Sequence, residues 1–352
     1  MALPLALTMG EPAGIGGEIA LRAWLRRGEG VPPFYVIDDP GRLAALARCL
    51  GWDVPVCALA APQDAARGAT HDALRIFAEA LPVLPAGGAP RAAPGRPDRA
   101  DAPLVIGAID AAVAEVRAGR AAAVVTNPIN KGALYRAGFR HPGHTEYLAE
   151  LAGTGRSAVM MLACQELRVV PVTIHLALRQ AVEQLSAAAI VHAGRVTNDA
   201  LIRDFGVPRP VLAVAGLNPH AGEAGALGRE DIDIIAPAIA ELRAAGIDAR
   251  GPLAADTMFH PEARQGYDAA LCMYHDQALI PVKTLDFHGA VNVTLGLPFI
   301  RTSPDHGTAF DIAGQGVARP DSLIAALKLA ARMAALRHTG AVDSPENPRA
   351  RA

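Results

Sequence analysis

The chain is poor in aromatic residues, which make up 4% of its 352 residues, and it has only four cysteines, Cys49, Cys57, Cys164 and Cys272. The cysteines show no CxxC spacing, which argues against a disulfide framework or a zinc–thiolate site and favours a reducing compartment. No apolar run reaches the roughly 18–20 residues of a membrane span. The first residues lack the basic start of a signal peptide. We therefore expect a cytoplasmic protein that does not enter a membrane.

The chain also lacks a strong charge of either sign. Its formal net charge is −2, and no basic stripe interleaved with aromatic residues is present. Nucleic-acid binding depends on such a stripe, so we expect no nucleic-acid partner. A small anionic ligand remains compatible with a few local basic residues.

Hydrophobic residues, in contrast, make up 51% of the chain. Short β-branched runs alternate with stretches rich in Ala, Leu and Arg that have helical periodicity, which predicts an α/β fold with a mainly parallel sheet. The predicted strands are Leu3–Met9, Pro33–Ile37, Ala122–Thr126, Val169–Ile174, Val211–Ala215, Ala269–Met273 and Ala290–Leu295. The predicted helices are Ile15–Leu25, Gly41–Leu50, Pro103–Arg117, Thr145–Ala152, Leu178–Leu185, Ala188–Phe205, Ile232–Ala245 and Pro320–Leu336.

Three histidines, His175, His220 and His275, follow the ends of predicted strands. Loops at the carboxyl ends of parallel strands converge on one crevice, so the three imidazoles are candidates for a shared divalent ion. For each histidine taken alone, a hydrogen-bonded loop residue is the alternative.

A second set is basic and polar: His144 with Thr145, Lys283, Asn292 and Arg301. Thr145 is a candidate N-cap, where a helix dipole favours an anion. Lys283 and Arg301 would supply charge-assisted contacts to a phosphate, unless they are solvated surface cations.

Two segments are rich in glycine. The stretch 10–17 lies between the first predicted strand and helix, but its glycines do not fit GxGxxG, so we expect a tight turn rather than a dinucleotide fingerprint. The stretch 306–316 leads into the last helix, and its glycines allow a close backbone approach to a nucleotide.

Read together, several segments resemble the 4-hydroxythreonine-4-phosphate dehydrogenase family of pyridoxine biosynthesis. They are spread in order over nearly the whole chain: 10–16 (GEPAGIG), 126–131 (TNPINK), 142–146 (PGHTE), 217–223 (LNPHAGE), 256–259 (DTMF), 274–277 (YHDQ) and 292–316.

The resemblance implies a two-lobed α/β/α fold like that of isocitrate and isopropylmalate dehydrogenases, with a mainly parallel mixed sheet. We expect residues 1–130 plus 288–340 to form an NAD-binding lobe and 131–287 to form a lobe for metal, substrate and dimerisation. It further implies a homodimer whose active site includes residues of both subunits.

The resemblance also assigns roles residue by residue. It implies that His175, His220 and His275 bind the metal, and that His144, Thr145, Lys283, Asn292 and Arg301 contact the substrate. Lys283 and Asp256 are candidates for the catalytic base, which the sequence does not identify. The cofactor-binding residues would be His306, Gly307, Thr308, Asp311, Gly314 and Gly316.

The implied reaction is NAD- or NADP-dependent oxidation of 4-phosphohydroxy-L-threonine to 2-amino-3-oxo-4-phosphooxybutanoate. This product decarboxylates to 3-amino-2-oxopropyl phosphate. One divalent ion per subunit (Zn, Mg, Mn or Co) would assist both steps. The alternatives are a dehydrogenase of the same family acting on D-threonate or D-erythronate 4-phosphate, a three-histidine metal hydrolase, and a binding protein that has lost catalysis.

Overall fold

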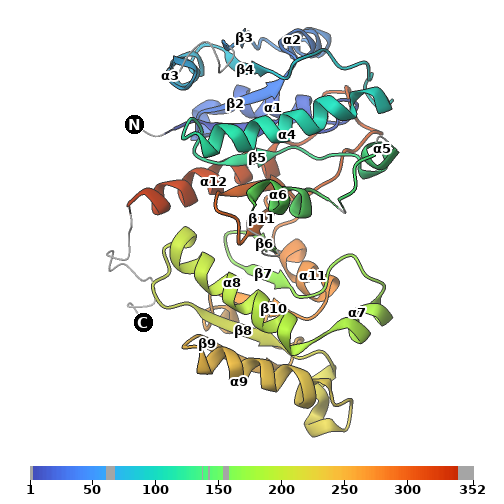
Figure 1. Ribbon diagram of the computed structural model, residues 1–352, viewed down its shortest axis with the longest axis vertical. Helices are drawn as coiled ribbons and strands as arrows, with labels where there is room; N and C mark the ends of the chain where they lie inside the picture. Colours follow the sequence, from blue (N-terminus) through green and yellow to red (C-terminus); the bar gives the residue numbers. More distant parts are fainter. Residues whose placement is uncertain (1–2, 61–67, 137, 142, 154–157, 340–352) are drawn as a thin grey trace. The chain divides into compact units, whose positions relative to one another are not determined.

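The computed structural model describes residues 3–60, 68–136, 138–141, 143–153 and 158–339. The chain divides into two compact units (Figure 1). Unit 1 contains residues 1–160 and 286–331, and unit 2 contains residues 161–285 and 332–352.

The strands of unit 1 form a sheet in the order β3-β4-β2-β1-β5-β12-β11. Neighbouring strands run parallel except β11 and β12, which are antiparallel. The strands are β1 (Leu5–Thr8), β2 (Phe34–Asp38), β3 (Val56–Ala58), β4 (Leu81–Pro85), β5 (Val124–Thr126), β11 (Val291–Leu295) and β12 (Arg301–Pro304). Every residue of β1, β2 and β5 is buried, as expected for a parallel sheet covered on both faces.

The helices of unit 1 are α1 (Gly16–Leu25), α2 (Pro40–Cys49), α3 (Gly68–Ile76), α4 (Ala102–Arg117), α5 (Lys131–Arg136), α6 (His144–Ala152) and α12 (Asp321–Thr339, which begins in unit 1 and ends in unit 2). Short 3-10 turns cover Arg27–Glu29 and Arg99–Asp101. Local chemistry sets the start of α2, where the Asp39 carboxylate accepts from the amide of Arg42 at 2.6 Å and Pro40 takes the first helical position. Helix α4 packs against β1, β2 and β5 (Figure 1).

Helices α5 and α6 belong to unit 1, whereas the sequence analysis expected residues 131–287 to form the other lobe. The reason is packing. Leu148 and Ala152 of α6 join the same buried cluster as Ile109 of α4, and Leu134 of α5 packs with Val105. The apolar faces of both helices are therefore covered by α4.

Unit 2 has a sheet in the order β6-β7-β10-β8-β9. Strands β6 and β7 are antiparallel, and the remaining neighbours are parallel. Its strands are β6 (Val159–Ala163, which begins in unit 1), β7 (Arg168–Pro171), β8 (Val211–Ala215), β9 (Asp248–Leu253) and β10 (Ala269–Cys272). Its helices are α7 (Leu178–Gln184), α8 (Ala187–Phe205), a π-helical turn Asp231–Ile235 that continues into α9 (Ala236–Ala244), α10 (Pro261–Arg264) and α11 (His275–Leu285).

The expected fold class, α/β with a mainly parallel mixed sheet, is confirmed. All seven predicted strands and all eight predicted helices are present within a few residues of their expected bounds. The prediction missed β3, β4, β6, β9 and β12, together with α3, α5, α10 and α11. Within the described residues, no helix is long and apolar enough to cross a membrane.

Candidate active site

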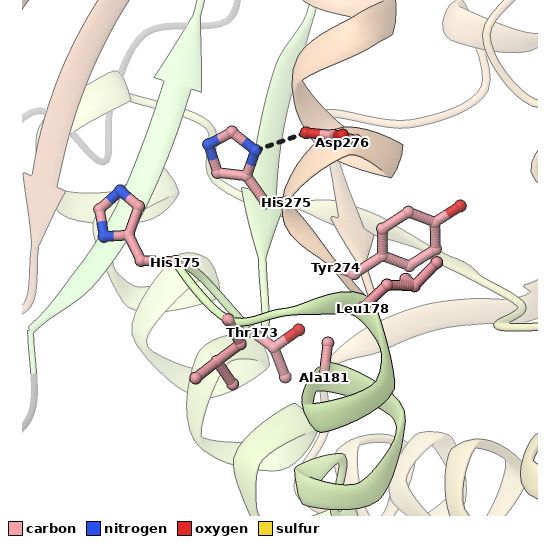
Figure 2. Close-up of a pocket in the computed structure, with 8 residues that line it drawn as sticks. Thr173, His175, Leu178, Ala181, Tyr274, His275 and Asp276 are labelled. Carbon is pink, nitrogen blue, oxygen red and sulfur yellow. Dashed lines mark hydrogen bonds and ion pairs between the residues drawn. The ribbon is translucent and has the colours of Figure 1, made fainter.

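Two of the three candidate metal ligands lie together in unit 2. The ring centroids of His175 and His275 are 5.9 Å apart, and both side chains line a cavity of about 250 Å³ (Figure 2). The other lining residues come from the segment after β7, from α7 and from the start of α11: Thr173, Leu176, Leu178, Ala181, Tyr274 and Asp276. The cavity therefore forms where the carboxyl ends of β7 and β10 lie side by side.

His275 is the first residue of α11, and not a loop residue as the sequence suggested. Pro281 lies inside this helix, which is why the sequence pattern did not predict it. The His275 Nδ1 atom lies 2.7 Å from an Asp276 carboxylate oxygen (Figure 2). An imidazole held by a carboxylate at Nδ1 presents Nε2 outward, which is the usual arrangement of a metal-binding histidine.

Gln277 fixes the start of α11. Its buried side chain accepts from the Met273 amide at 2.6 Å and donates to the Gly216 carbonyl at 2.7 Å. The first turn of α11 is thereby tied to the ends of β10 and β8, so the backbone that carries His275 is fixed from two strands.

His175 and His220 both adopt left-handed backbone conformations, with φ of 51° and 52°. His220 lies in a turn, Pro219–Gly225, in which every residue from His220 to Ala224 has a positive φ. Non-glycine residues pay about 1–2 kcal/mol each for this conformation. Asp231 supports the turn, because its buried carboxylate accepts from the amides of Leu217 and Asn218 at 2.9 and 3.2 Å.

His220 does not join the other two histidines. Among the described residues, no group of three His, Cys, Asp or Glu side chains is arranged to hold a metal ion.

The candidate bases also lie in unit 2: Asp256 is exposed in the turn after β9, and Lys283 is half-buried near the end of α11.

The second set of candidates lies in unit 1 and centres on Arg301 at the start of β12. This arginine is 3% exposed, and its terminal nitrogens donate to the hydroxyls of Thr294 at 2.8 Å and Thr126 at 2.6 Å. No ion pair joins it to a carboxylate of the described residues, and its Nε has no hydrogen-bond partner there. Burial lowers the pKa of Arg301 to about 10, so the group is still charged at neutral pH.

His144 lies close enough to Arg301 to sense its charge. Burial, followed by the positive charges of Arg301 and Lys131, holds the pKa of His144 well below its ordinary value. The ring is therefore neutral at neutral pH, and its Nε2 is shielded from solvent without a partner among the described residues.

The sequence predicted Thr145 as an N-cap, and this is wrong. Gly143 is the N-cap of α6, and no side chain caps the helix. A Cβ at Gly143 would lie 3.2 Å from Cε of Lys131, so glycine leaves space for the lysine to lie over the start of α6. Thr145 lies inside the first turn, next to His144.

Asn292 completes this set through the sheet register. Thr294 lies directly opposite Arg301 in the antiparallel β11–β12 pair, and Asn292 is two residues earlier on β11, on the same face. Its buried Oδ1 also lacks a hydrogen-bond partner among the described residues. Buried polar atoms without a hydrogen-bond partner are rare in proteins. Three of them, Arg301 Nε, His144 Nε2 and Asn292 Oδ1, belong to this set, which indicates a site for a polar ligand.

The 306–316 segment is a loop of unit 1 that packs on the first glycine-rich turn. The Ile15 amide donates to the Thr308 carbonyl at 3.0 Å, and a Cβ at Gly14 would lie 2.8 Å from that oxygen. The 10–17 stretch is therefore the tight turn that the sequence predicted. On the other side of the loop, Gly307 and Asp311 are exposed, and nothing lies within 4 Å of a Cβ placed on Gly307.

Sequence reasoning missed several residues that belong to these sets. Thr126 ends β5 and Lys131 begins α5, so both satisfied the strand-end criterion used for the histidines, but neither was given a role. Asp276 was overlooked as the partner of its neighbour His275.

Comparisons with known proteins agree over most of the chain. The family model described as "Pyridoxal phosphate biosynthetic protein PdxA" matches residues 32–330. A 4-hydroxythreonine-4-phosphate dehydrogenase of Bradyrhizobium diazoefficiens is 59% identical over 96% of this chain and 98% of its own length. A crystal structure of the Klebsiella pneumoniae enzyme of the same name covers 95% of this chain and 100% of its own, with 37% identity and a TM-score of 0.82. A terephthalate 1,2-cis-dihydrodiol dehydrogenase of Burkholderia xenovorans LB400 is more distant, with 28% identity and a TM-score of 0.62 over 94% of this chain and 98% of its own.

Proposed function

The chain belongs to the family of the pyridoxal phosphate biosynthetic protein PdxA, and on that premise we propose that it is a 4-hydroxythreonine-4-phosphate dehydrogenase. It oxidises 4-phosphohydroxy-L-threonine with NAD or NADP, and the β-keto acid product loses CO₂ to give 3-amino-2-oxopropyl phosphate. The observation that carries the proposal is the set of unsatisfied buried polar atoms around Arg301, which suits an anionic, polar substrate.

In unit 1, Arg301, His144 and Asn292 bind the anionic and hydroxyl groups of the substrate. A buried guanidinium without a carboxylate partner has a large desolvation cost, which a bound phosphate or carboxylate offsets. A neutral His144 adds a hydrogen bond through Nε2 without repelling Arg301. Thr145 follows His144 in the first turn of α6, and the Lys131 side chain of α5 lies beside Gly143 at the start of that helix, so both are proposed as further contacts.

In unit 2, His175 and His275 hold a divalent ion. Two imidazoles that face one cavity, one of them oriented by Asp276, fit such an ion in donor chemistry. His220 is the proposed third ligand, and assembly of a homodimer is the proposed means of completing the ligand set. The bound ion supplies Lewis-acid chemistry, which favours loss of the hydroxyl proton and, after oxidation, loss of CO₂.

The 306–316 loop is the proposed cofactor-binding segment, with His306, Gly307, Thr308, Asp311, Gly314 and Gly316 as its contacts. Its exposed glycine at 307 permits close approach of a ligand, and its other side is fixed by the turn before α1. Lys283 and Asp256 are the candidates for accepting the hydroxyl proton. The proposed location is the cytoplasm, which the lack of CxxC spacing among the four cysteines favours.

The alternatives are less well supported. D-threonate and D-erythronate 4-phosphates differ from the proposed substrate at the amino group, and the relative with 59% identity carries the hydroxythreonine name. A three-histidine hydrolase would not need a cofactor loop such as 306–316. In this loop nothing lies within 4 Å of a Cβ placed on Gly307, so the backbone there is open to a ligand.

The decisive experiment follows NADH formation by the purified protein with 4-phosphohydroxy-L-threonine, with and without a chelator. D-threonate 4-phosphate and D-erythronate 4-phosphate serve as matched substrates. We expect chelator-sensitive turnover that prefers the amino acid. Preference for a sugar-acid phosphate would contradict the assigned substrate, and turnover that needs no nicotinamide cofactor would contradict the dehydrogenase itself.

A further inference from the structure

Helix α1 carries a buried carboxylate that binds the backbone of the 306–316 loop and the residues that follow it. Glu18 is 1% exposed, and its two carboxylate oxygens accept from the amides of Gly314 at 3.1 Å and Ala318 at 2.8 Å. A buried carboxylate is costly unless its oxygens are hydrogen-bonded, and here the loop backbone supplies the donors.

Arg22 lies one helical turn after Glu18 and binds the same segment. Its guanidinium donates to the Gly316 carbonyl and lies 4.9 Å from the centre of the Trp52 ring. The indole also contacts the loop, because a Cβ at Gly316 would lie 3.5 Å from the ring. Residues four apart share one face of a helix, so α1 presents an acceptor and a donor to successive groups of the loop.

The loop needs this support because it has little structure of its own. Within it, the backbone bonds are the turn-like Ile312 amide to Ala309 carbonyl and Gln315 amide to Ile312 carbonyl, both at 3.2 Å. Gly314 and Gly316 have φ of 76° and 70°, a conformation that regular helices and strands do not use. The Glu18 and Arg22 side chains therefore fix the loop where its own hydrogen bonds do not.

We propose that Glu18 and Arg22 are positioning residues for the nicotinamide dinucleotide, acting by holding the backbone at 314–318 in its binding conformation. The proposal rests on the proposed function, because it takes the 306–316 loop as the cofactor-binding segment. Neither side chain needs to touch the cofactor. A loop that is already ordered binds a ligand without losing conformational entropy at that moment, so the effect falls on affinity.

The test uses the variants Glu18→Gln and Arg22→Lys in the full-length protein. The amide of Glu18→Gln can accept from one loop N–H but turns its own NH₂ group toward the other, and Arg22→Lys loses the planar group that stacks on Trp52. We expect the KM and the calorimetric Kd for NAD to rise about tenfold or more, while kcat at saturating NAD stays within about threefold of the wild type. Hydrogen exchange should accelerate in peptides that cover 312–318.

Arg195→Gln is the matched control. Arg195 is an exposed arginine of α8 in unit 2 that pairs with Glu241 at 3.0 Å, and its loss should leave the affinity for NAD unchanged. Glu18→Asp keeps the charge and should restore part of the affinity. Wild-type affinity for NAD in Glu18→Gln, with only a lower melting temperature, would show that Glu18 is merely structural and would overturn the proposal. A wild-type protein that neither binds nor reduces NAD would instead overturn the proposed function, and the positioning role with it.

Discussion

The two sets of candidate functional residues bear their structural cost in different ways. In unit 1, Arg301 is buried and its backbone lies in a regular strand, so the cost is desolvation of a charge and of polar atoms that lack partners. In unit 2, His175 and His220 are exposed, and the cost lies in their left-handed backbone. The difference fits the proposed ligands. A substrate anion requires a concentrated positive charge, whereas a metal ion requires lone pairs that point to one position.

The comparison leads to distinct expectations for mutations. Replacing a buried polar side chain of the unit 1 set by an apolar one should remove the cost of burying a charge or an unpaired polar atom. It should therefore affect function more than stability. Removing a group from the unit 2 set should relieve backbone strain only if the new residue tolerates a positive φ.

The largest effect is expected for Arg301→Met. It removes the buried charge and should lower kcat/KM about a thousandfold, which corresponds to about 4 kcal/mol of lost transition-state stabilisation. The melting temperature should change little, since the relief of a buried charge offsets the two hydrogen bonds that Thr126 and Thr294 lose and no ion pair is broken. Arg42→Met provides the contrast, because the fully buried Asp38 that pairs with Arg42 at 2.7 Å would lose its cationic partner and keep only the hydrogen bond from the Asp39 amide. This variant should lose about 3–5 kcal/mol of stability. A strongly destabilised Arg301→Met would argue against an uncompensated charge at this position.

Asp276→Asn should weaken metal binding by about tenfold, because His275 loses the carboxylate that orients its ring. The measurement is metal content after dialysis against a series of free-ion concentrations, read beside turnover. Stability without metal should change little, since Asp276 is exposed. Wild-type metal affinity together with wild-type turnover would show that the contact with Asp276 does not orient His275 for metal binding.

At His220, glycine and alanine substitutions separate strain from ligation. Both should abolish turnover and weaken metal binding, because both remove the imidazole. His220→Gly should be more stable than His220→Ala by about 1 kcal/mol, since only glycine adopts a φ of 52° without strain. Urea unfolding of the two variants measures this difference. A fully active, metal-independent His220→Ala enzyme would contradict the proposed ligand role.

The smallest effect is expected from His144 and pH. Its pKa in the folded protein lies below the unfolded value of about 6.5, so the unfolded chain binds more protons as the pH falls through that value. The stability that comes from keeping this ring neutral is complete above about pH 6.5 and is lost progressively below it. His144→Gln should therefore flatten the fall in stability between pH 7 and 5. If the free energies of unfolding of the wild type and the variant fall equally between pH 7 and 5, the lowered pKa of His144 is contradicted.

Polarity explains why the sequence missed β12, although it does not explain the apolar strands β3, β4 and β6, which were missed as well. Strand β5, with Val124 and Val125, was predicted, whereas β12, which begins with Arg301, Thr302 and Ser303, was not, although all of these residues are buried. Central strands are normally apolar, and this one departs from the rule because it carries the candidate anion site. Strand β9 was missed because Gly251 and Pro252 interrupt it at the edge of the sheet.

The candidate site shows the same limit. The strand-end criterion and the family resemblance together point to His144, Asn292 and Arg301. The sequence alone does not reveal that Arg301 donates to Thr126, which is 175 positions away, because that contact exists only once β5 and β12 are neighbours. Nor does it show which polar atoms are left without partners, since this depends on the burial that the finished sheet produces.

The threonine hydroxyls on β5 and β11 have a further consequence for Arg301. They engage both terminal nitrogens of the guanidinium from two different strands, so the side chain is locked in one rotamer before any ligand arrives. Its conformational entropy is lost during folding and is not lost again on binding. The site is thus preorganised: the guanidinium does not adjust to the ligand, and a ligand must approach from the direction that the sheet has already set.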